Sequence, residues 1–415
     1  MGEDTLSSVL AEEDRHPHLQ PLVIDLVCRY LAFKELRACC CVSKQFRSFA
    51  DRELRSAARK SRPKFFTWLG PKVTLRHLKS AFFQTKARRD LRNKFKAAID
   101  TLPFVPTRAV AVFTGFGKHL MQELVMAIGR RKDMEEVVRK YFVIDVNDLV
   151  EVIGVRGCEV VSCSVGTAIL TPELSPRHVH ELTNFRETKI PAFSCLLFPD
   201  IPGVSLHPYH SVPLFRQPSS PLTDLNCRLE FPVDGPEIDI DDVKGALHLG
   251  TITNASEKEV MSTLKYNGVK TTYFRGSMTR LSTQPHPDCL EAFRDPGKEM
   301  YYQIEQSCGV VFEGEKAVCV LMDLGEYEEN RRREIEREMK HAKERLFADP
   351  KLRPKSIVAF MSANLEYKLK DDLLMDLEVF GEVFPGVPLM GTMSKNAERL
   401  KYRRPISSTM LVGFC

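Results

Sequence analysis

The spacing of apolar residues near the N-terminus predicts three short helices. Val23, Val27 and Leu31 lie four positions apart, and Ile24 fills the gap before Val27, which makes one apolar stripe of a helix. A second pattern follows Phe33, and its apolar face consists of Leu36, Cys39 and Cys40; a third pattern carries Phe46 and Phe49. Domains shorter than roughly 40 residues usually need a disulfide, a bound metal or a partner chain to be stable. We therefore expect something else to cover these apolar faces.

From residue 108 onward the pattern changes to short apolar runs that alternate with helical segments, as in β-α-β units. The three predicted units comprise Ala109–Phe113, Lys118–Arg130 and Cys158–Cys163; Ala246–Ile252, a helix after Ser256 and Val269–Phe274; and Ser356–Met361, Leu369–Val379 and Val387–Gly391. Their similarity indicates internal duplication. Two antiparallel hairpins are expected between them, Ala192–Phe198 with Val204–Tyr209 and Cys308–Phe312 with Ala317–Met322. The predicted class is α+β, or mixed α/β.

Between these two parts lies a basic stretch. From Arg55 to Lys96 lysines and arginines are dense, and Asp90 is the one acidic residue. Apolar side chains are interleaved with them (Phe65, Phe66, Trp68, Leu69, Leu75, Leu78, Phe82 and Phe83), which predicts two or three helices rather than a disordered tail. We interpret the basic residues as a solvent-exposed face rather than a nucleic-acid-binding surface. No zinc-finger, homeodomain or RNP pattern is present, and the net charge is only +5.

The N-terminal helical pattern resembles an F-box. The residues at matching positions are Val23, Ile24, Val27, Tyr30, Leu31, Leu36, Val42, Ser43, Lys44 and Arg47, with Phe46 where tryptophan is usual. The resemblance implies docking on the adaptor Skp1, and through it on a cullin-RING ubiquitin ligase. The Skp1-binding residues it implies are Pro21, Leu22, Val23, Ile24, Val27, Leu31, Leu36, Val42 and Phe46. The other interpretation is that the three helices are part of an ordinary protein core. Apolar helical periodicity indicates that a face is buried, but it does not indicate whether a partner protein buries it.

The strand-rich part resembles the FIST domain. The segments that carry this likeness are CEVVSCSVGTAILTPELS, FSCLLFPDIPGVSLHPYH, SCGVVFEGEKAVCVLMD and FPGVPLMGTMSKNAE. The two resemblances together imply a disordered N-terminus (1–16), an F-box (17–55), a basic helical linker (56–105), two FIST halves (106–212 and 237–415) and a Pro-rich linker between them (213–236). They imply a substrate receptor whose FIST region holds an unknown protein for ubiquitination and proteasomal degradation. The alternative is a cytosolic α/β protein that senses a small ligand, as bacterial FIST relatives are thought to do.

Motifs for catalysis are absent from the sequence, which has no nucleophile elbow, zincin, phosphate-binding-loop or dinucleotide-binding pattern. We therefore expect no catalytic residue, no cofactor and no metal; Cys39, Cys40 and Cys41 are adjacent and point in different directions on a helix. The loop Thr114–Gly117 could hold a phosphate or be a plain turn, and His207, Tyr209 and His210 form a polar cluster without an acidic residue nearby in sequence.

The expected location is cytoplasmic or nuclear. The 12 cysteines are scattered, as in a reduced protein, and no apolar run reaches the eighteen residues of a membrane span. The acidic N-terminus lacks the layout of a signal peptide. The charged segment Glu326–Leu346 predicts a surface helix that covers a sheet with a thin apolar edge of Ile335, Met339 and Leu346.

Overall fold

The computed structural model divides the chain into two compact units, which are described separately. A helical unit contains residues 1–61 and 100–105, and a larger sheet unit contains residues 62–99 and 106–415. The residues described are 21–31, 33–60, 62–70, 81–114, 158–165, 168–170, 192–214, 226–230, 238, 240–250, 264, 268–275, 278–281, 307–325, 330–364, 370–394 and 407–415. The expected disordered segment 1–16, the predicted helix Lys118–Arg130 and most of the predicted helix after Ser256 lie outside them.

The helical unit contains the three helices that the apolar spacing predicts. They are α2 (Pro21–Tyr30), α3 (Phe33–Cys39) and α4 (Lys44–Lys60). Ser43 caps α4, because its Oγ accepts a hydrogen bond of 3.2 Å from the Phe46 backbone N–H. The small core of the unit consists of Ile24, Cys28, Leu36 and Ala50, with Leu31, Phe46 and Phe49 among the half-buried side chains packed against it.

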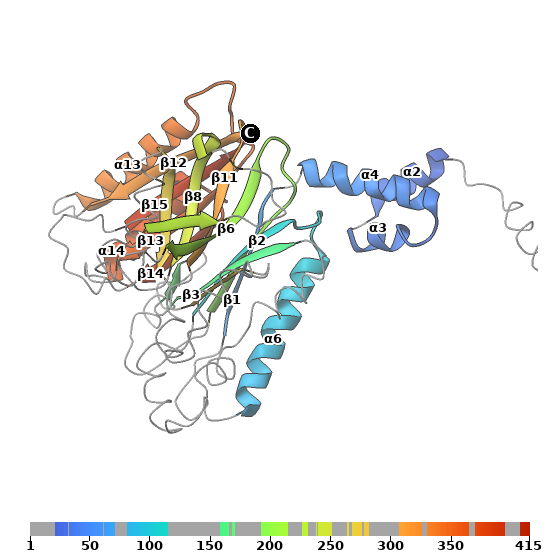
Figure 1. The fold of residues 1–415 in the computed structure, drawn as a ribbon, viewed down its shortest axis with the longest axis horizontal. Helices are drawn as coiled ribbons and strands as arrows, with labels where there is room; N and C mark the ends of the chain where they lie inside the picture. The colour runs from blue at the N-terminus through green and yellow to red at the C-terminus, as the bar shows by residue number, and fades with distance from the viewer. Residues whose placement is uncertain are drawn as a thin grey trace, which may run out of the picture. The chain divides into compact units, whose positions relative to one another are not determined.

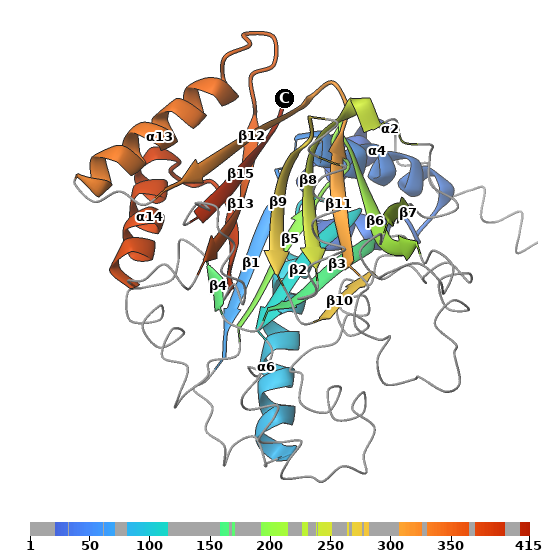
Figure 2. The same ribbon diagram turned by 60° about the vertical axis from the view of Figure 1, so that its left-hand side comes forward.

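Three sheets form the larger unit (Figure 2). The first has the strand order β1 (Lys64–Leu69), β5 (Ala192–Phe198), β2 (Arg108–Thr114), β3 (Glu159–Val165), β10 (Met278–Leu281). The second is β7 (Asn226–Glu230), β6 (Ser205–Leu214), β11 (Ser307–Glu313), β8 (Val243–Gly250), β9 (Lys270–Arg275), and a short 3-10 turn (Ile240–Asp242) precedes β8. The third is β12 (Ala317–Leu324), β15 (Ser407–Phe414), β13 (Ser356–Asn364), β14 (Leu389–Ser394), β4 (Ala168–Leu170).

Each sheet contains one parallel pair, and each pair joins the two strands of one predicted β-α-β unit. The pairs are β2 with β3, β8 with β9, and β13 with β14. In the third unit the connecting helix α14 (Lys370–Val383) is described as well. The mixed α/β class and the parallel pairing that the sequence predicts are therefore confirmed.

The sheets share one order of strands, which shows a threefold internal repeat. In each, one strand (β1, β6 or β12) pairs with a central strand (β5, β11 or β15), and the central strand pairs with the first member of the parallel pair. In the second sheet β7 adds an edge strand beside β6. Backbone bonds repeat too: Thr107 N–H donates to the Phe198 carbonyl over 2.9 Å, and Lys355 N–H donates to the Phe414 carbonyl over 2.8 Å. The repeats exchange strands, because β4 joins the third sheet and β10 the first. The expected halves 106–212 and 237–415 therefore exchange strands within one unit.

A single apolar core lies between the three sheets. Each central strand has a phenylalanine at or next to its carboxyl end that belongs to this core, and the rings of Phe198, Phe312 and Phe414 form a triangle with centroid separations of 6.4, 6.1 and 6.4 Å. All three rings are at most 2% exposed. We call the side of each sheet that faces this core the inner face and the opposite side the outer face.

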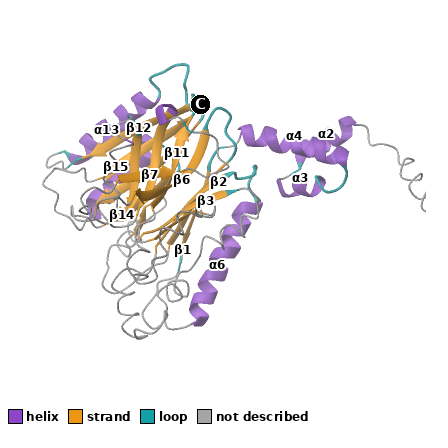
Figure 3. Cartoon of the chain, viewed as in Figure 1, coloured by secondary structure: helices purple, strands orange, loops and turns teal. Residues whose placement is uncertain are grey.

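Helices cover the outer faces of the first and third sheets (Figures 1 and 3). Helix α6 (Ala81–Asp100) follows β1, and its Phe95 contacts Phe66 and Phe193 of the first sheet with ring centroids 5.1 and 5.4 Å away. Helix α13 (Arg331–Leu346) follows β12 in the same way and buries Ile335, Met339, Ala342 and Leu346. The predicted surface helix with its thin apolar edge is therefore confirmed.

The basic linker 56–105 is only partly helical, which corrects the sequence prediction. Residues Lys64–Leu69 form strand β1, paired along its whole length with β5, and α6 belongs to the sheet unit. The segment KFFTWL is rich in aromatic residues, which suit a pleated, half-buried surface. Trp68 is 3% exposed, and its indole N–H donates to Asp90 of α6 over 2.9 Å. The Pro-rich linker 213–236 is also not entirely a loop, because it contains the end of β6 and all of β7.

Both predicted hairpins are wrong, although all four strands exist. β5 and β6 lie in different sheets, as do β11 and β12. The two edges of β5 are occupied by β1 and β2, and those of β11 by β6 and β8. After each strand the chain turns through a glycine with positive φ, Gly203 (80°) or Gly314 (111°), into the next sheet. The two corners touch, since Lys316 N–H donates to the Gly203 carbonyl over 3.2 Å.

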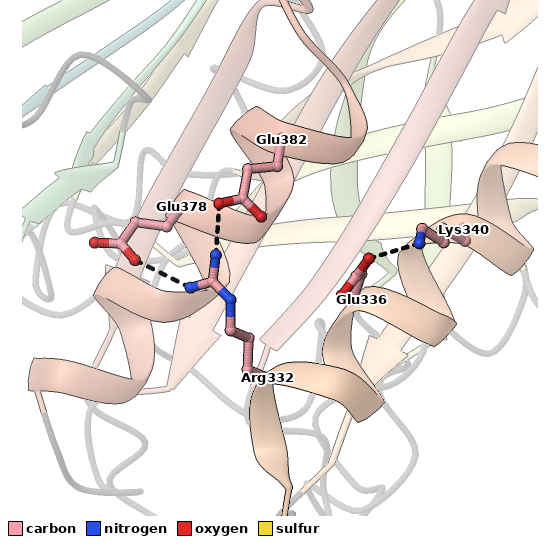
Figure 4. A network of polar contacts seen from close by, with 5 residues as sticks. All are labelled: Arg332, Glu336, Lys340, Glu378 and Glu382. Atoms are coloured by element: carbon pink, nitrogen blue, oxygen red, sulfur yellow. Dashed lines mark hydrogen bonds and ion pairs between the residues drawn. The ribbon is translucent and has the colours of Figure 1, made fainter.

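Polar contacts fasten α13 to α14. Arg331 forms an ion pair of 3.1 Å with Asp376, whose side chain is fully buried and also accepts a bond of 3.2 Å from Ser407 Oγ of β15. On the surface Arg332 reaches Glu378 and Glu382 (Figure 4). The i,i+4 pair of Glu336 with Lys340, predicted from the sequence, has a separation of 2.5 Å. Exposed pairs of this kind add little stability and are screened by salt.

Candidate functional site

The helical unit presents an apolar surface that nothing described in the chain covers. Five of its large apolar side chains are exposed: Val23 (42%), Leu26 (55%), Val27 (43%), Tyr30 (83%) and Val42 (67%). Four of them follow the i, i+3, i+4, i+7 spacing of one face of α2, and Val42 precedes α4. Among the described residues of the larger unit, only Phe347 is a comparably exposed large apolar residue. We call Val23, Leu26, Val27, Tyr30 and Val42 the apolar face.

The sequence-predicted Skp1-binding residues divide between this face and the unit's own core. Val23, Val27 and Val42 are on the face, and Pro21 is exposed beside them at the start of α2. Ile24 and Leu36 are 2% and 5% exposed within the core, whereas Leu31 and Phe46 are half-buried against it. The side chain of Leu22 lies outside the described residues.

The predicted single stripe on the first helix is thus two stripes. Ile24 and Cys28 point into the unit, and Val23, Val27 and Tyr30 point out of it. Leu26 and Tyr30 share this exposed face but are not among the sequence-predicted binding residues. The available signal was that apolar residues occur around most of α2, which is more than a small core needs.

Cationic side chains border the apolar face. The carboxylate of Asp25 lies between the guanidinium groups of Arg29 and Arg52, whose side chains are 60% and 55% exposed. Arg47 at the start of α4 is exposed too, and its Nε donates to the Cys40 carbonyl over 3.0 Å. Two arginines share one carboxylate, so this border carries excess positive charge. An apolar partner surface with an acidic rim would complement it.

A second candidate site lies on the outer face of the second sheet, where the sequence points to His207, Tyr209 and His210. The Tyr209 hydroxyl and His248 Nδ1 are 2.8 Å apart, and both residues are fully buried. The His248 ring stacks on Tyr209 and on Tyr273, with centroids 5.8 and 5.4 Å away. We call Tyr209, His248 and Tyr273 the Tyr-His-Tyr row.

His207 has an acidic partner that the sequence prediction did not find. Its Nε2 is 2.7 Å from Glu313 Oε2, and the two side chains are 10% and 20% exposed. Glu313 and His248 come from β11 and β8, far along the chain from β6, so only the sheet register brings them to His207 and Tyr209. The side chain of His210 lies outside the described residues.

Burial controls the protonation of the Tyr-His-Tyr row. It lowers the pKa of His248 from 6.5 to about 3 and raises the pKa of Tyr209 well above its ordinary value, because both charged forms would lose water. The imidazole and the phenol are therefore neutral at physiological pH.

Acid is expected to destabilise the sheet unit through His248. The folded pKa is about 3 and the ordinary value 6.5, so between these values the unfolded chain binds a proton that the folded chain does not. The free energy of unfolding is therefore highest above pH 6.5 and falls as the pH drops toward 3. Between pH 7 and pH 5 we expect this histidine to lower it by about 2 kcal/mol. Urea unfolding of the wild type and of a Tyr209→Phe/His248→Phe variant at both pH values measures it. If both proteins lose the same free energy of unfolding between pH 7 and pH 5, His248 is not the cause of the acid destabilisation.

Other candidate sites from the sequence gain no support. Gly115, Phe116 and Gly117 of the phosphate-loop candidate lie outside the described residues. Within the described part of the chain, no group of three or more His, Cys, Asp or Glu side chains is arranged to hold a metal ion. None of the described helices has the length and apolar character that a membrane crossing requires.

No known family model and no curated protein matches this chain. Among solved structures, a cyanuric acid hydrolase from A. caulinodans is similar over 85% of this chain and 99% of its own, with 7% identity and a TM-score of 0.30. A second cyanuric acid hydrolase structure covers 86% of this chain and 100% of its own, with 9% identity and a TM-score of 0.24. Scores this low identify neither the fold nor the activity of the chain.

Proposed function

We propose that the protein is the substrate-recognition subunit of a Skp1-cullin-F-box type ubiquitin ligase. In this proposal the helical unit docks on Skp1, and the FIST-like sheet unit holds the protein that is to be ubiquitinated and degraded. The chain supplies binding surfaces and no catalytic group, and it acts in the cytoplasm or nucleus. The F-box and FIST resemblances in the sequence support the two assignments, since they occur in the order that such a receptor requires.

The observation that carries the proposal is the exposed apolar face of the helical unit. Large exposed apolar patches on soluble proteins mark interaction sites. The residues on it, Val23, Val27 and Val42 together with Tyr30, fall on positions that match the F-box pattern. Among the described residues, the core cluster of α2, α3 and α4 contains four buried side chains, so a partner that covers the face would also stabilise these helices.

A reconstitution with a tagged full chain, Skp1 and a cullin-RING pair tests the proposal. We expect the tagged chain to retain the cullin only when Skp1 is present, because Skp1 is the bridge. Retention of the cullin without Skp1, or no retention in either case, would contradict it. The second outcome would favour the alternative interpretation, in which the helices serve only the chain's own fold.

A further inference from the structure

The chain directly before α2 is tethered next to the exposed apolar face. Residues 1–20 lie outside the described part of the chain and lead into Pro21, the first residue of α2. Four of the five exposed apolar side chains of the face belong to α2 itself. A segment joined to this helix stays near the face, so the sequence of residues 1–20 shows whether the chain carries an occupant for its own surface.

Residues 1–14 contain the apolar side chains that such a surface needs. Val9 and Leu10 follow Leu6 at three and four positions, a spacing that places all three on one side of a helical turn. The two residues that follow Leu6, Ser7 and Ser8, are small and polar. A single short helix is marginal in water by itself, so a segment of this kind gains stability only against another apolar surface.

Charge favours the same pairing. Residues 1–14 contain five acidic side chains and no lysine or arginine, whereas residues 21–60 contain nine lysines and arginines and four acidic side chains. The acidic positions, 3–4 and 12–14, lie on both sides of the apolar three. The segment thus has an apolar middle between acidic ends, and the apolar face has a border of exposed arginines. These two surfaces are complementary in both respects.

A second copy of the helical unit fits the face less well. Two copies joined through their apolar faces would bring their arginine borders, Arg29 and Arg52 of each chain, close to one another. Like charges that meet at an interface disfavour association. The acidic segment has no such conflict, and it is present at every apolar face because it belongs to the same chain.

The connection is long enough for the segment to fold back along α2. From Val23 to Tyr30 the face extends about 10 Å along the helix axis. The ten residues 11–20 connect Leu10 to α2 and span up to about 33 Å when extended. A flexible tether of this length gives an effective concentration on the order of 1 mM. A weak contact is therefore sufficient to occupy the face for most of the time.

We propose that residues 1–14 dock on the apolar face of their own chain and compete with Skp1 for it. Leu6, Val9 and Leu10 cover the face in this arrangement, and the acidic residues meet the arginine border. The competition with Skp1 rests on the proposed function, whereas the docking itself does not. With a Kd of about 0.1 mM for the separate segment and a tether near 1 mM, the face is open about one tenth of the time. Loss of the docking then strengthens Skp1 binding about tenfold.

A peptide titration tests the docking without Skp1. The full-chain variant Leu6→Ser/Val9→Ser/Leu10→Ser frees the face, and a fluorescein-labelled peptide of residues 1–14 probes it by fluorescence anisotropy. At about 0.1 mM protein we expect about half of the peptide to bind this variant and about one tenth to bind the wild type, whose own segment competes. The matched control Ser7→Ala/Ser8→Ala keeps the apolar three and should bind the peptide as weakly as the wild type.

Three results of this titration would overturn the docking. The first is that the peptide does not bind the triple serine variant, which includes the case in which light scattering shows this variant to be a dimer with its face occupied by a second copy. The second is equal binding of the peptide to the variant and to the wild type. The third is undiminished binding after Val27→Asp is added to the variant, because the peptide would then bind elsewhere.

A Skp1 titration of the same proteins separates this proposal from the proposed function. We expect the triple serine variant to bind Skp1 about tenfold more tightly than the wild type, and Ser7→Ala/Ser8→Ala to bind like the wild type. Skp1 binding without peptide binding would overturn the docking and leave the proposed function intact. Peptide binding without Skp1 binding would do the reverse. Equal Skp1 affinities of the variant and the wild type would overturn the competition.

Discussion

Val27→Asp is expected to weaken binding of the full chain to Skp1 by at least about 100-fold. Val27 is 43% exposed on the apolar face and is not part of the core of the helical unit. A carboxylate enclosed at an apolar interface without a partner costs several kcal/mol, and about 2.7 kcal/mol already corresponds to a factor of 100. Isothermal titration calorimetry with purified Skp1 measures the effect, and circular dichroism checks that the helices remain.

Phe347→Asp is the matched control for this prediction. Phe347 is 38% exposed on the sheet unit, so the change introduces the same charge at another exposed apolar residue. It should bind Skp1 like the wild type. Leu31→Asp is a poorer choice than the sequence alone suggests, because Leu31 packs against the core of the helical unit and its loss would unfold the helices. Equal affinities of Val27→Asp and the wild type would remove the apolar face from the interface.

Phe312→Ala is expected to lower the free energy of unfolding of the sheet unit by about 4 kcal/mol. The Phe312 ring is fully buried, contacts Phe198 and Phe414 in the triangle, and lies 5.8 Å from the Phe360 ring. Removing it leaves a cavity where all three sheets meet, and no single sheet can close that cavity by a local shift.

Urea unfolding followed by tryptophan fluorescence measures this change. The chain has one tryptophan, Trp68, which is buried in β1 of the same unit, so the signal reports the sheet unit alone. Phe312→Leu keeps most of the volume and should cost clearly less. A loss below about 1 kcal/mol for Phe312→Ala would show that the triangle is not the centre of a shared core.

The sequence predicted local elements well because their signals are local. Helix α2, strand β2 and each element of the unit from β13 to β14 follow from the local spacing of apolar residues. Which strands pair with each other was harder to predict. A short connection that contains glycine has the same sequence signature whether it closes a hairpin or leads the chain into another sheet. The corners at Gly203 and Gly314 are of the second kind.

The candidate sites were only partly predictable for a related reason. The sequence indicates that α2 is apolar, but which side faces the core depends on α3 and α4, and so Ile24 is inside while Val27 is outside. Around Tyr209 the decisive partner is His248, 39 residues further along the chain, and the sheet register alone makes them neighbours. Residues 64–69 of the predicted helical linker form a strand because β5 offers them an edge to pair with.

The most direct test of the central claim is the mass of the species formed when the purified full chain is mixed with Skp1. Size-exclusion chromatography with light scattering gives this mass. The account predicts one peak whose mass is that of the 47.3 kDa chain plus one Skp1, and its loss in Val27→Asp but not in Phe347→Asp. Two separate peaks at the masses of the individual proteins would contradict the assignment of the helical unit as a Skp1-docking module.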